Sequence, residues 1–166
     1  YMYNLKFKNN DLMPAFGLGT WKAKKGEVAA AIREAIRIGY RHFDCAAVYG
    51  NEKEIGQAFA DAFAAGEVKR EDLWITSKLW NTHHRESEVR PALEKTLADL
   101  QLDYLDLYLV HWPVVVKHDA PFPFTADAFI SLKKIPLAET WRGMEAVHEA
   151  GLCRHIGVAN FSIEKL

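Results

Sequence analysis

Residues 27–45, EVAAAIREAIRIGYRHFDC, contain a helix pattern followed directly by a strand pattern. In the first part, Val28, Ile32 and Ile36 recur at helical spacing, which places them on one face of an amphipathic helix. Gly39 then stands where helices commonly end in the left-handed conformation. Residues 40–45 are short and apolar enough for a buried strand. The stretch therefore predicts a helix closed by glycine and a strand packed beneath it.

The same pattern of helix and strand recurs along the rest of the chain. Asn51 and Glu54 have the spacing of a capping box, so we expect them to cap the second helix. The predicted helices are at residues 27–38, 51–65, 86–100 and 137–150, and the strands that follow them are at residues 40–45, 73–77, 105–110 and 153–158.

Apolar strands that alternate with single helices are typical of a parallel sheet covered by helices. Residues 17–20 would form the first parallel strand, residues 5–16 a small hairpin before it, and residues 162–166 the start of a fifth helix. A complete (β/α)8 TIM barrel needs roughly 250 residues. We therefore expect residues 1–166 to be the N-terminal portion of one barrel domain, with the hairpin and about five β/α units. A doubly wound sheet is the alternative.

Composition narrows the class of protein further. The formal net charge is -1 and 49% of residues are hydrophobic, so nothing favours nucleic acid or an anionic membrane as a partner. No apolar run approaches the roughly 18 residues of a membrane span, and residues 1–10 do not resemble a signal peptide. Cys45 and Cys153 are too few for a disulfide framework. We expect reduced thiols in a cytoplasmic protein.

The connection at residues 111–136 is much longer than the others and contains Phe122, Phe124 and Phe129. Loops longer than about 15 residues in compact domains are usually functional or disordered. This connection follows a strand, and ligands bind at that end of the strands in β/α folds. We therefore expect this segment to take part in function.

Four polar residues stand at or just after the carboxyl ends of neighbouring predicted strands. Asp44 ends the second strand, with Tyr49 in the turn behind it, Lys78 ends the third strand and His111 ends the fourth. A single polar residue at such a position is usually structural. Four of them at one edge of a sheet indicate an active site. We expect Lys78 to form hydrogen bonds with both Asp44 and Tyr49.

This set of residue types suits proton donation to an oxygen. An isolated tyrosine has a pKa of about 10, and a lysine ammonium beside the phenol makes it a stronger acid. A carboxylate paired with the lysine keeps the ammonium charged and in place. A histidine beside the tyrosine can form a hydrogen bond with a substrate oxygen and orient it. Reduction of a carbonyl by hydride requires such a proton donor.

Five motifs, in order and with similar spacing, resemble the aldo-keto reductase family, and most of all its aldose, xylose and polyol-phosphate reductases. The signature around a catalytic aspartate and tyrosine is similar to residues 39–52, GYRHFDCAAVYGNE. The other four motifs are GLGTW at residues 17–21, ITSKLW at residues 75–80, LDLYLVHWP at residues 105–113 and GVANF at residues 157–161.

The resemblance implies a (β/α)8 barrel that reduces an aldehyde, ketone or aldose carbonyl to an alcohol. It implies Tyr49 as the proton donor, Lys78 and Asp44 as the residues that adjust its acidity, and His111 as the residue that orients the carbonyl. The substrate would lie against Tyr49, His111 and three tryptophans, which are Trp21, Trp80 and Trp112.

The resemblance also implies a nicotinamide cofactor, which in this family is usually NADP(H). The nicotinamide ribose would lie along Gly19, Thr20, Trp21 and Asp44, and Asn160 would bind the carboxamide. In the family a serine usually precedes this asparagine and shares its task, whereas this chain has alanine there. The residues that bind the 2′-phosphate come later in the family than residue 166, so NAD(H) stays open.

Two other interpretations are kept. A metal-dependent barrel hydrolase would use His42, Asp44 and His111 as ligands, but it leaves Tyr49 and Lys78 without a role. A binding or structural relative would keep the fold without turnover. Residues 1–166 alone would have open sheet edges and lack part of the cofactor site. We therefore expect that fragment to be inactive, and either to self-associate or to require the remaining strands from another chain.

Overall fold

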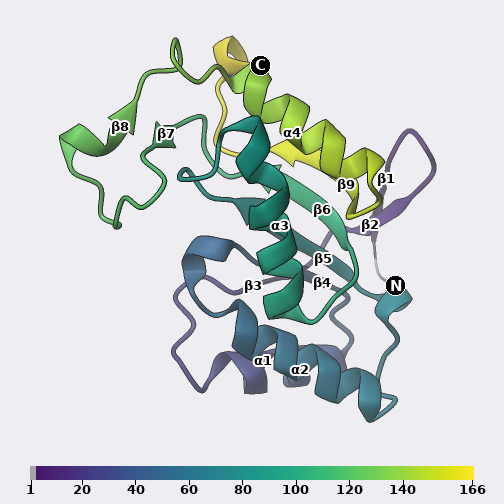
Figure 1. Cartoon of the computed structure of the whole chain (residues 1–166). Coiled ribbons are helices and arrows are strands. Elements are labelled where there is room, and N and C mark those ends of the chain that lie inside the picture. Colours follow the sequence, from purple (N-terminus) through teal and green to yellow (C-terminus); the bar gives the residue numbers. More distant parts are fainter. Residues whose placement is uncertain (1–2) are drawn as a thin grey trace.

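The computed structural model describes residues 3–166, and its central feature is a five-stranded parallel sheet (Figure 1). Each strand lies beside the one before it in the chain, as in successive units of a β/α barrel. The alternative of a doubly wound sheet is wrong, because that fold reverses its strand order at a switch point. In order across the sheet, the strands are β3 (Leu18–Gly19), β4 (His42–Asp44), β5 (Trp74–Leu79), β6 (Leu105–Val110) and β9 (Cys153–Val158).

All four predicted helices are confirmed, and Figure 1 shows them lying over one face of the sheet. The turn after the first helix has Gly39 at a φ of 107°, the left-handed conformation that its position predicted. The expected fifth helix is a single 3₁₀ turn, Ile163–Lys165. Within residues 3–166, no helix combines the length and the apolar character that crossing a membrane requires. The helices are α1 (Val28–Ile38), α2 (Glu52–Ala64), α3 (Glu86–Leu100) and α4 (Leu137–Glu149).

Two glycines allow the helices to pack closely on one another. A Cβ atom on Gly56 of α2 would lie 2.2 Å from the backbone oxygen of Asp99 at the end of α3. A Cβ atom on Gly143 of α4 would lie 2.6 Å from Cγ2 of Val89 in α3. Either contact would push the helices apart, so glycine at these positions sets the spacing of the helix layer.

The alternation of side chains along β5 separates the core from the site. Ile75, Ser77 and Leu79 are buried on the side that faces the helices, where Ile75 and Leu79 join the hydrophobic core. Thr76 and Lys78 point to the other side of the sheet, because successive strand residues face opposite ways. A strand without a single exposed residue therefore still carries a functional side chain.

The predicted hairpin is confirmed as β1 (Asn4–Lys6) paired with β2 (Leu12–Pro14). Just after β1, Phe7 stacks on Trp74 at 5.4 Å between ring centroids and contacts His155 at 4.4 Å. Trp74 begins β5 and His155 lies early in β9, so the hairpin covers the amino ends of the strands. The carboxyl ends of the strands are left for the site.

The capping box predicted at Asn51 and Glu54 is wrong. Asn51 makes no side-chain cap bond to α2, and its Nδ2 donates to the backbone oxygen of Thr20 at 2.9 Å. The Glu54 carboxylate instead accepts hydrogen bonds from the backbone N–H groups of Gly26 and Ala29 at the start of α1. Both side chains make tertiary contacts in place of the local ones, because α1 and α2 pack side by side.

The long connection after β6 contains a small antiparallel ribbon, β7 (Val115–Val116) and β8 (Phe129–Ile130). Figure 1 shows this ribbon standing to one side of the sheet. The N–H group of Val116 donates to the backbone oxygen of Asn81, just after β5, at 3.0 Å. The connection is therefore anchored at the carboxyl end of the sheet, where its position in the chain predicted it.

Candidate active site

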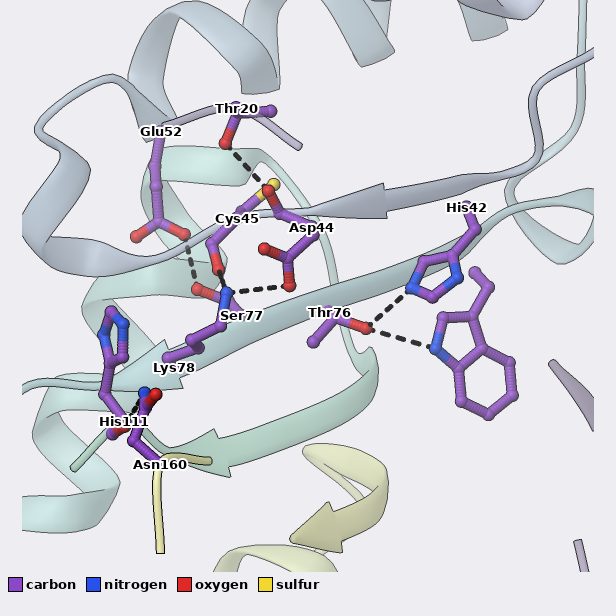
Figure 2. Close-up of polar contacts among 11 residues, drawn as sticks. Thr20, His42, Asp44, Cys45, Glu52, Thr76, Ser77, Lys78, His111 and Asn160 are labelled. Atoms are coloured by element: carbon purple, nitrogen blue, oxygen red, sulfur yellow. Dashed lines mark hydrogen bonds and ion pairs between the residues drawn. The ribbon is translucent and has the colours of Figure 1, made fainter. Parts of the chain in front are cut away.

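The Lys78 ammonium and the Asp44 carboxylate form an ion pair between adjacent strands (Figure 2). Nζ of Lys78 donates to Oδ1 of Asp44 at 2.7 Å and to the backbone oxygen of Cys45 at 2.9 Å. Lys78 is 7% exposed, and a buried ammonium is stable only when acceptors of this kind replace water. The expected bond between Lys78 and Asp44 is confirmed, and it fixes the ammonium at the carboxyl edge of the sheet.

Tyr49 lies at the end of a 3₁₀ turn, Ala47–Tyr49, that follows β4. Nζ of Lys78 is 5.3 Å from the centre of the Tyr49 ring, a cation–π contact. The expected hydrogen bond between the Tyr49 hydroxyl and Lys78 is not formed in the described part of the chain. The ammonium donates two of its three N–H groups to the carboxylate and the carbonyl, and it lies over the face of the Tyr49 ring instead of beside its hydroxyl.

His111, directly after β6, completes this group of side chains. Its ring lies 6.0 Å from the Tyr49 ring, nearly edge-on. Burial, together with the nearby Lys78 ammonium, lowers the pKa of His111 to about 4, so the ring is neutral at pH 7. Nδ1 is buried and has no hydrogen-bond partner among residues 3–166, which an unprotonated nitrogen tolerates better than an N–H group. This favours the tautomer in which Nε2 carries the proton and can donate it to a ligand.

A cavity of about 550 Å³ opens beside Tyr49 and His111. All three predicted tryptophans, Trp21, Trp80 and Trp112, line it. The long connection supplies the opposite wall, where Phe124 stacks on Trp80 with 5.8 Å between ring centroids. A pocket with these aromatic walls fits a small, largely apolar molecule whose polar atom reaches Tyr49 and His111.

The residues predicted to hold a nicotinamide also lie at this edge, and the polar atoms there fit such a group. Asn160, exposed after β9, donates from Nδ2 to the backbone oxygen of His111 at 2.9 Å, which leaves its own Oδ1 for a carboxamide N–H. The Asp44 side chain is 41% exposed and uses only Oδ1 for Lys78, so its second oxygen can accept from a ribose hydroxyl. Trp21 and Gly19 are exposed at the end of β3.

Thr20 has a structural contact in the same region. Its hydroxyl donates to the backbone oxygen of Asp44 at 2.9 Å and the residue is 1% exposed. The side chain and the backbone N–H, which donates to the same oxygen at 3.1 Å, therefore hold β3 against β4, and the exposed residues on either side are Gly19 and Trp21.

Sequence reasoning did not identify Glu52, which lies behind the site. Its carboxylate accepts a hydrogen bond from the hydroxyl of Ser77 at 2.8 Å (Figure 2) and another from the hydroxyl of Thr96 at 3.0 Å. Glu52 thus connects the helix that follows the Tyr49 turn with the strand of Lys78 and with α3. An acidic residue in the first turn of a helix is ordinary, so the sequence carried no signal that this one is 5% exposed.

Glu52 leads to a prediction on stability. Burial raises its pKa to about 7 from an ordinary value of 4.5, so the folded protein retains this proton at pH values where the unfolded chain has lost it. The contribution of this bound proton to the free energy of unfolding is fully present below about pH 4.5 and is lost as pH rises through 7. We compare Glu52→Gln with the parent in a complete barrel containing residues 1–166. As the pH rises from 5 to 8, the free energy of unfolding of the variant should increase relative to that of the parent by on the order of 2 kcal/mol. Urea unfolding at both pH values measures this, and parallel pH curves for the two proteins would contradict it.

The placement of His42 removes the ligand set of the metal hydrolase. Its Nδ1 lies 2.8 Å from the backbone oxygen of Pro14 and its Nε2 lies 3.3 Å from Oγ1 of Thr76. Figure 2 shows the ring beside Thr76, away from Lys78 and His111. His42 and Asp44 do share a strand face, as predicted, but His42 begins β4 and Asp44 ends it.

Fold and site together define a β/α-barrel architecture whose polar side chains meet at the carboxyl edge of the sheet. The model of the Aldo/keto reductase family matches residues 15–166. The chain therefore belongs to the aldo/keto reductase family, whose fold is the (β/α)8 barrel.

Individual relatives agree with this assignment. An aldo/keto reductase from Synechocystis is 55% identical over 95% of this chain, and aldo-keto reductase family 1 member A1 from Bos taurus is 53% identical over 93%. The structure of the aldose reductase from Schistosoma japonicum superposes with a TM-score of 0.92 at 47% identity and covers 99% of this chain and 55% of its own. A Bombyx mori aldo-keto reductase in complex with NADP has a TM-score of 0.88 at 40% identity, with 99% and 52% covered. The chain spans 48% of the length of both curated relatives, about half.

Proposed function

We propose that residues 1–166 supply the proton-donating half of an NADP(H)-dependent reductase that converts an aldehyde, ketone or aldose carbonyl to an alcohol. They would form the first part of a single barrel domain. The observation that carries this proposal is the arrangement of Tyr49, His111 and the Lys78–Asp44 pair beside one aromatic cavity. Membership of the family and the NADP complex of the Bombyx mori relative support the cofactor.

In this function a bound nicotinamide would supply the hydride that the carbonyl carbon accepts. Nε2–H of neutral His111 donates a hydrogen bond to the carbonyl oxygen and orients it toward Tyr49. The Tyr49 hydroxyl gives its proton to that oxygen as negative charge develops there. The Lys78 ammonium, held by Asp44, lies over the Tyr49 ring and stabilises the phenolate that remains. The aromatic walls exclude water from the reacting atoms.

Asn160, Asp44, Trp21 and the backbone at Gly19 would hold the nicotinamide end of the cofactor, and Thr20 would keep the end of β3 in place beside them. Asn160 has a free carbonyl oxygen and Asp44 a free carboxylate oxygen. They lie at the carboxyl ends of β4 and β9, with β5 and β6 between them in the same parallel sheet.

The test is an assay of NADPH oxidation, followed at 340 nm, with a complete barrel that contains residues 1–166 and a panel of aldehydes, ketones and aldoses. We expect aldehyde-dependent oxidation of NADPH and formation of the alcohol. Binding of NADPH without turnover of any carbonyl compound would support the binding or structural relative instead. The same assay with NADH measures the cofactor preference.

A further inference from the structure

Asn81 is a buried polar residue without a partner on the wall of the aromatic cavity. It lies in the turn after β5, next to Trp80, and is 5% exposed. Its Oδ1 is buried without a hydrogen bond, and its side-chain amide bonds to nothing within residues 3–166. Its backbone is held in place, because its carbonyl oxygen accepts from the N–H group of Val116.

An unpaired amide at such a position requires an explanation. Buried polar groups in native proteins almost always have hydrogen-bond partners, because leaving one unpaired costs free energy. The cavity that Asn81 lines is mostly apolar, and within residues 3–166 no other lining side chain forms a hydrogen bond with its Oδ1. An apolar residue of the same size would pack there at lower cost, so the amide is suited to an occupant of the cavity.

We propose that Asn81 determines substrate specificity by forming a hydrogen bond with a second oxygen of the substrate, distinct from the reacting carbonyl. The preferred class is then small aldehydes that carry a hydroxyl or another oxygen beyond the carbonyl, over apolar aldehydes of the same shape. The reacting oxygen is held by Tyr49 and His111, so Asn81 adds a second point of recognition. This inference rests on the carbonyl reduction proposed above.

The experiment uses two pairs of substrates that are nearly identical in shape, with the substituent at the meta or the para position. In each pair hydroxymethylbenzaldehyde is compared with ethylbenzaldehyde, so that a hydroxyl replaces a methyl group. The parent, in a complete barrel containing residues 1–166, should have a higher kcat/KM for at least one hydroxymethyl compound than for its ethyl partner. Asn81→Leu should reduce that preference about tenfold, mainly by lowering kcat/KM for the hydroxymethyl compound.

Thermal stability distinguishes recognition from a structural role. Because Leu removes a polar group that has no partner within residues 3–166, the Tm of Asn81→Leu should equal or exceed that of the parent. Thr82→Val is the matched control, since Thr82 is buried in the same turn and its hydroxyl contacts Nδ1 of His83 at 2.7 Å. That variant should keep the substrate preference and lose stability.

The opposite results would overturn the inference. They are an unchanged preference in Asn81→Leu, or equal losses for both members of a pair with a lower Tm. If Asn81→Leu does not fold, Asn81→Ala is measured in the same way, and failure of both variants to fold shows a structural role. If the parent reduces neither member of any pair, the function proposed above has failed. If the parent reduces the ethyl and the hydroxymethyl compounds with equal kcat/KM, only the role of Asn81 has failed.

Discussion

Replacing Tyr49 with phenylalanine should reduce turnover of an aldehyde by about 10²–10⁴-fold, the usual contribution of general acid catalysis. The change removes the hydroxyl that donates the proton and keeps the ring that contacts Trp21, His111 and the Lys78 ammonium. Binding of NADPH should therefore be retained. The measurement is kcat by NADPH oxidation together with the cofactor Kd by fluorescence, in a complete barrel containing residues 1–166.

Tyr40→Phe is the control for loss of a hydroxyl. Tyr40 is half-buried and packs against Phe16, away from the cavity, with 5.1 Å between the ring centroids. The kcat of Tyr40→Phe should therefore match that of the parent. A Tyr49→Phe protein whose kcat stayed within a few-fold of the parent would exclude Tyr49 as the acid.

Replacing Lys78 with methionine should also reduce kcat strongly, by about 10²-fold or more. Methionine has a similar length and packs in the same buried position, but it leaves Asp44 without its cation and Tyr49 without the charge that favours the phenolate. The Asp44 side chain is 41% exposed and water can solvate it, so the protein should still fold.

A variant that conserves the charge of Lys78 separates this role from a structural one. Circular dichroism checks that the fold is intact. Lys78→Arg keeps the charge with a different shape and should keep more activity than Lys78→Met. If the two variants were equally active, the charge of Lys78 would not matter to the reaction.

Local patterns were sufficient for most of the fold. The spacing of Val28, Ile32 and Ile36, followed by Gly39, specifies where a helix lies and ends, because amphipathic periodicity and left-handed glycine act over a few residues. The same reasoning recovered the later helices and strands, and the hairpin. It failed at Asn51 and Glu54, whose side chains bond to segments far away in the sequence.

The positions of the candidate site residues were also accessible from the sequence. Parallel strands bring their carboxyl ends to one edge, so Asp44, Lys78 and His111 had to be neighbours once the strands were assigned. The bond from Lys78 to the backbone oxygen of Cys45, and the contact with the face of the Tyr49 ring in place of its hydroxyl, depended on exact distances. A sequence pattern contains no such distances.

The sequence by itself determined the order of helices and strands, the edge at which the polar residues meet and the family to which they are similar, because these follow from periodicity, chain order and residue type. Only the tertiary structure decided the environment of each group. Glu52 is buried between Ser77 and Thr96, His111 is neutral, and Oδ1 of Asn81 has no partner in the described part of the chain. Burial and hydrogen bonding depend on segments that the fold brings together from distant parts of the sequence.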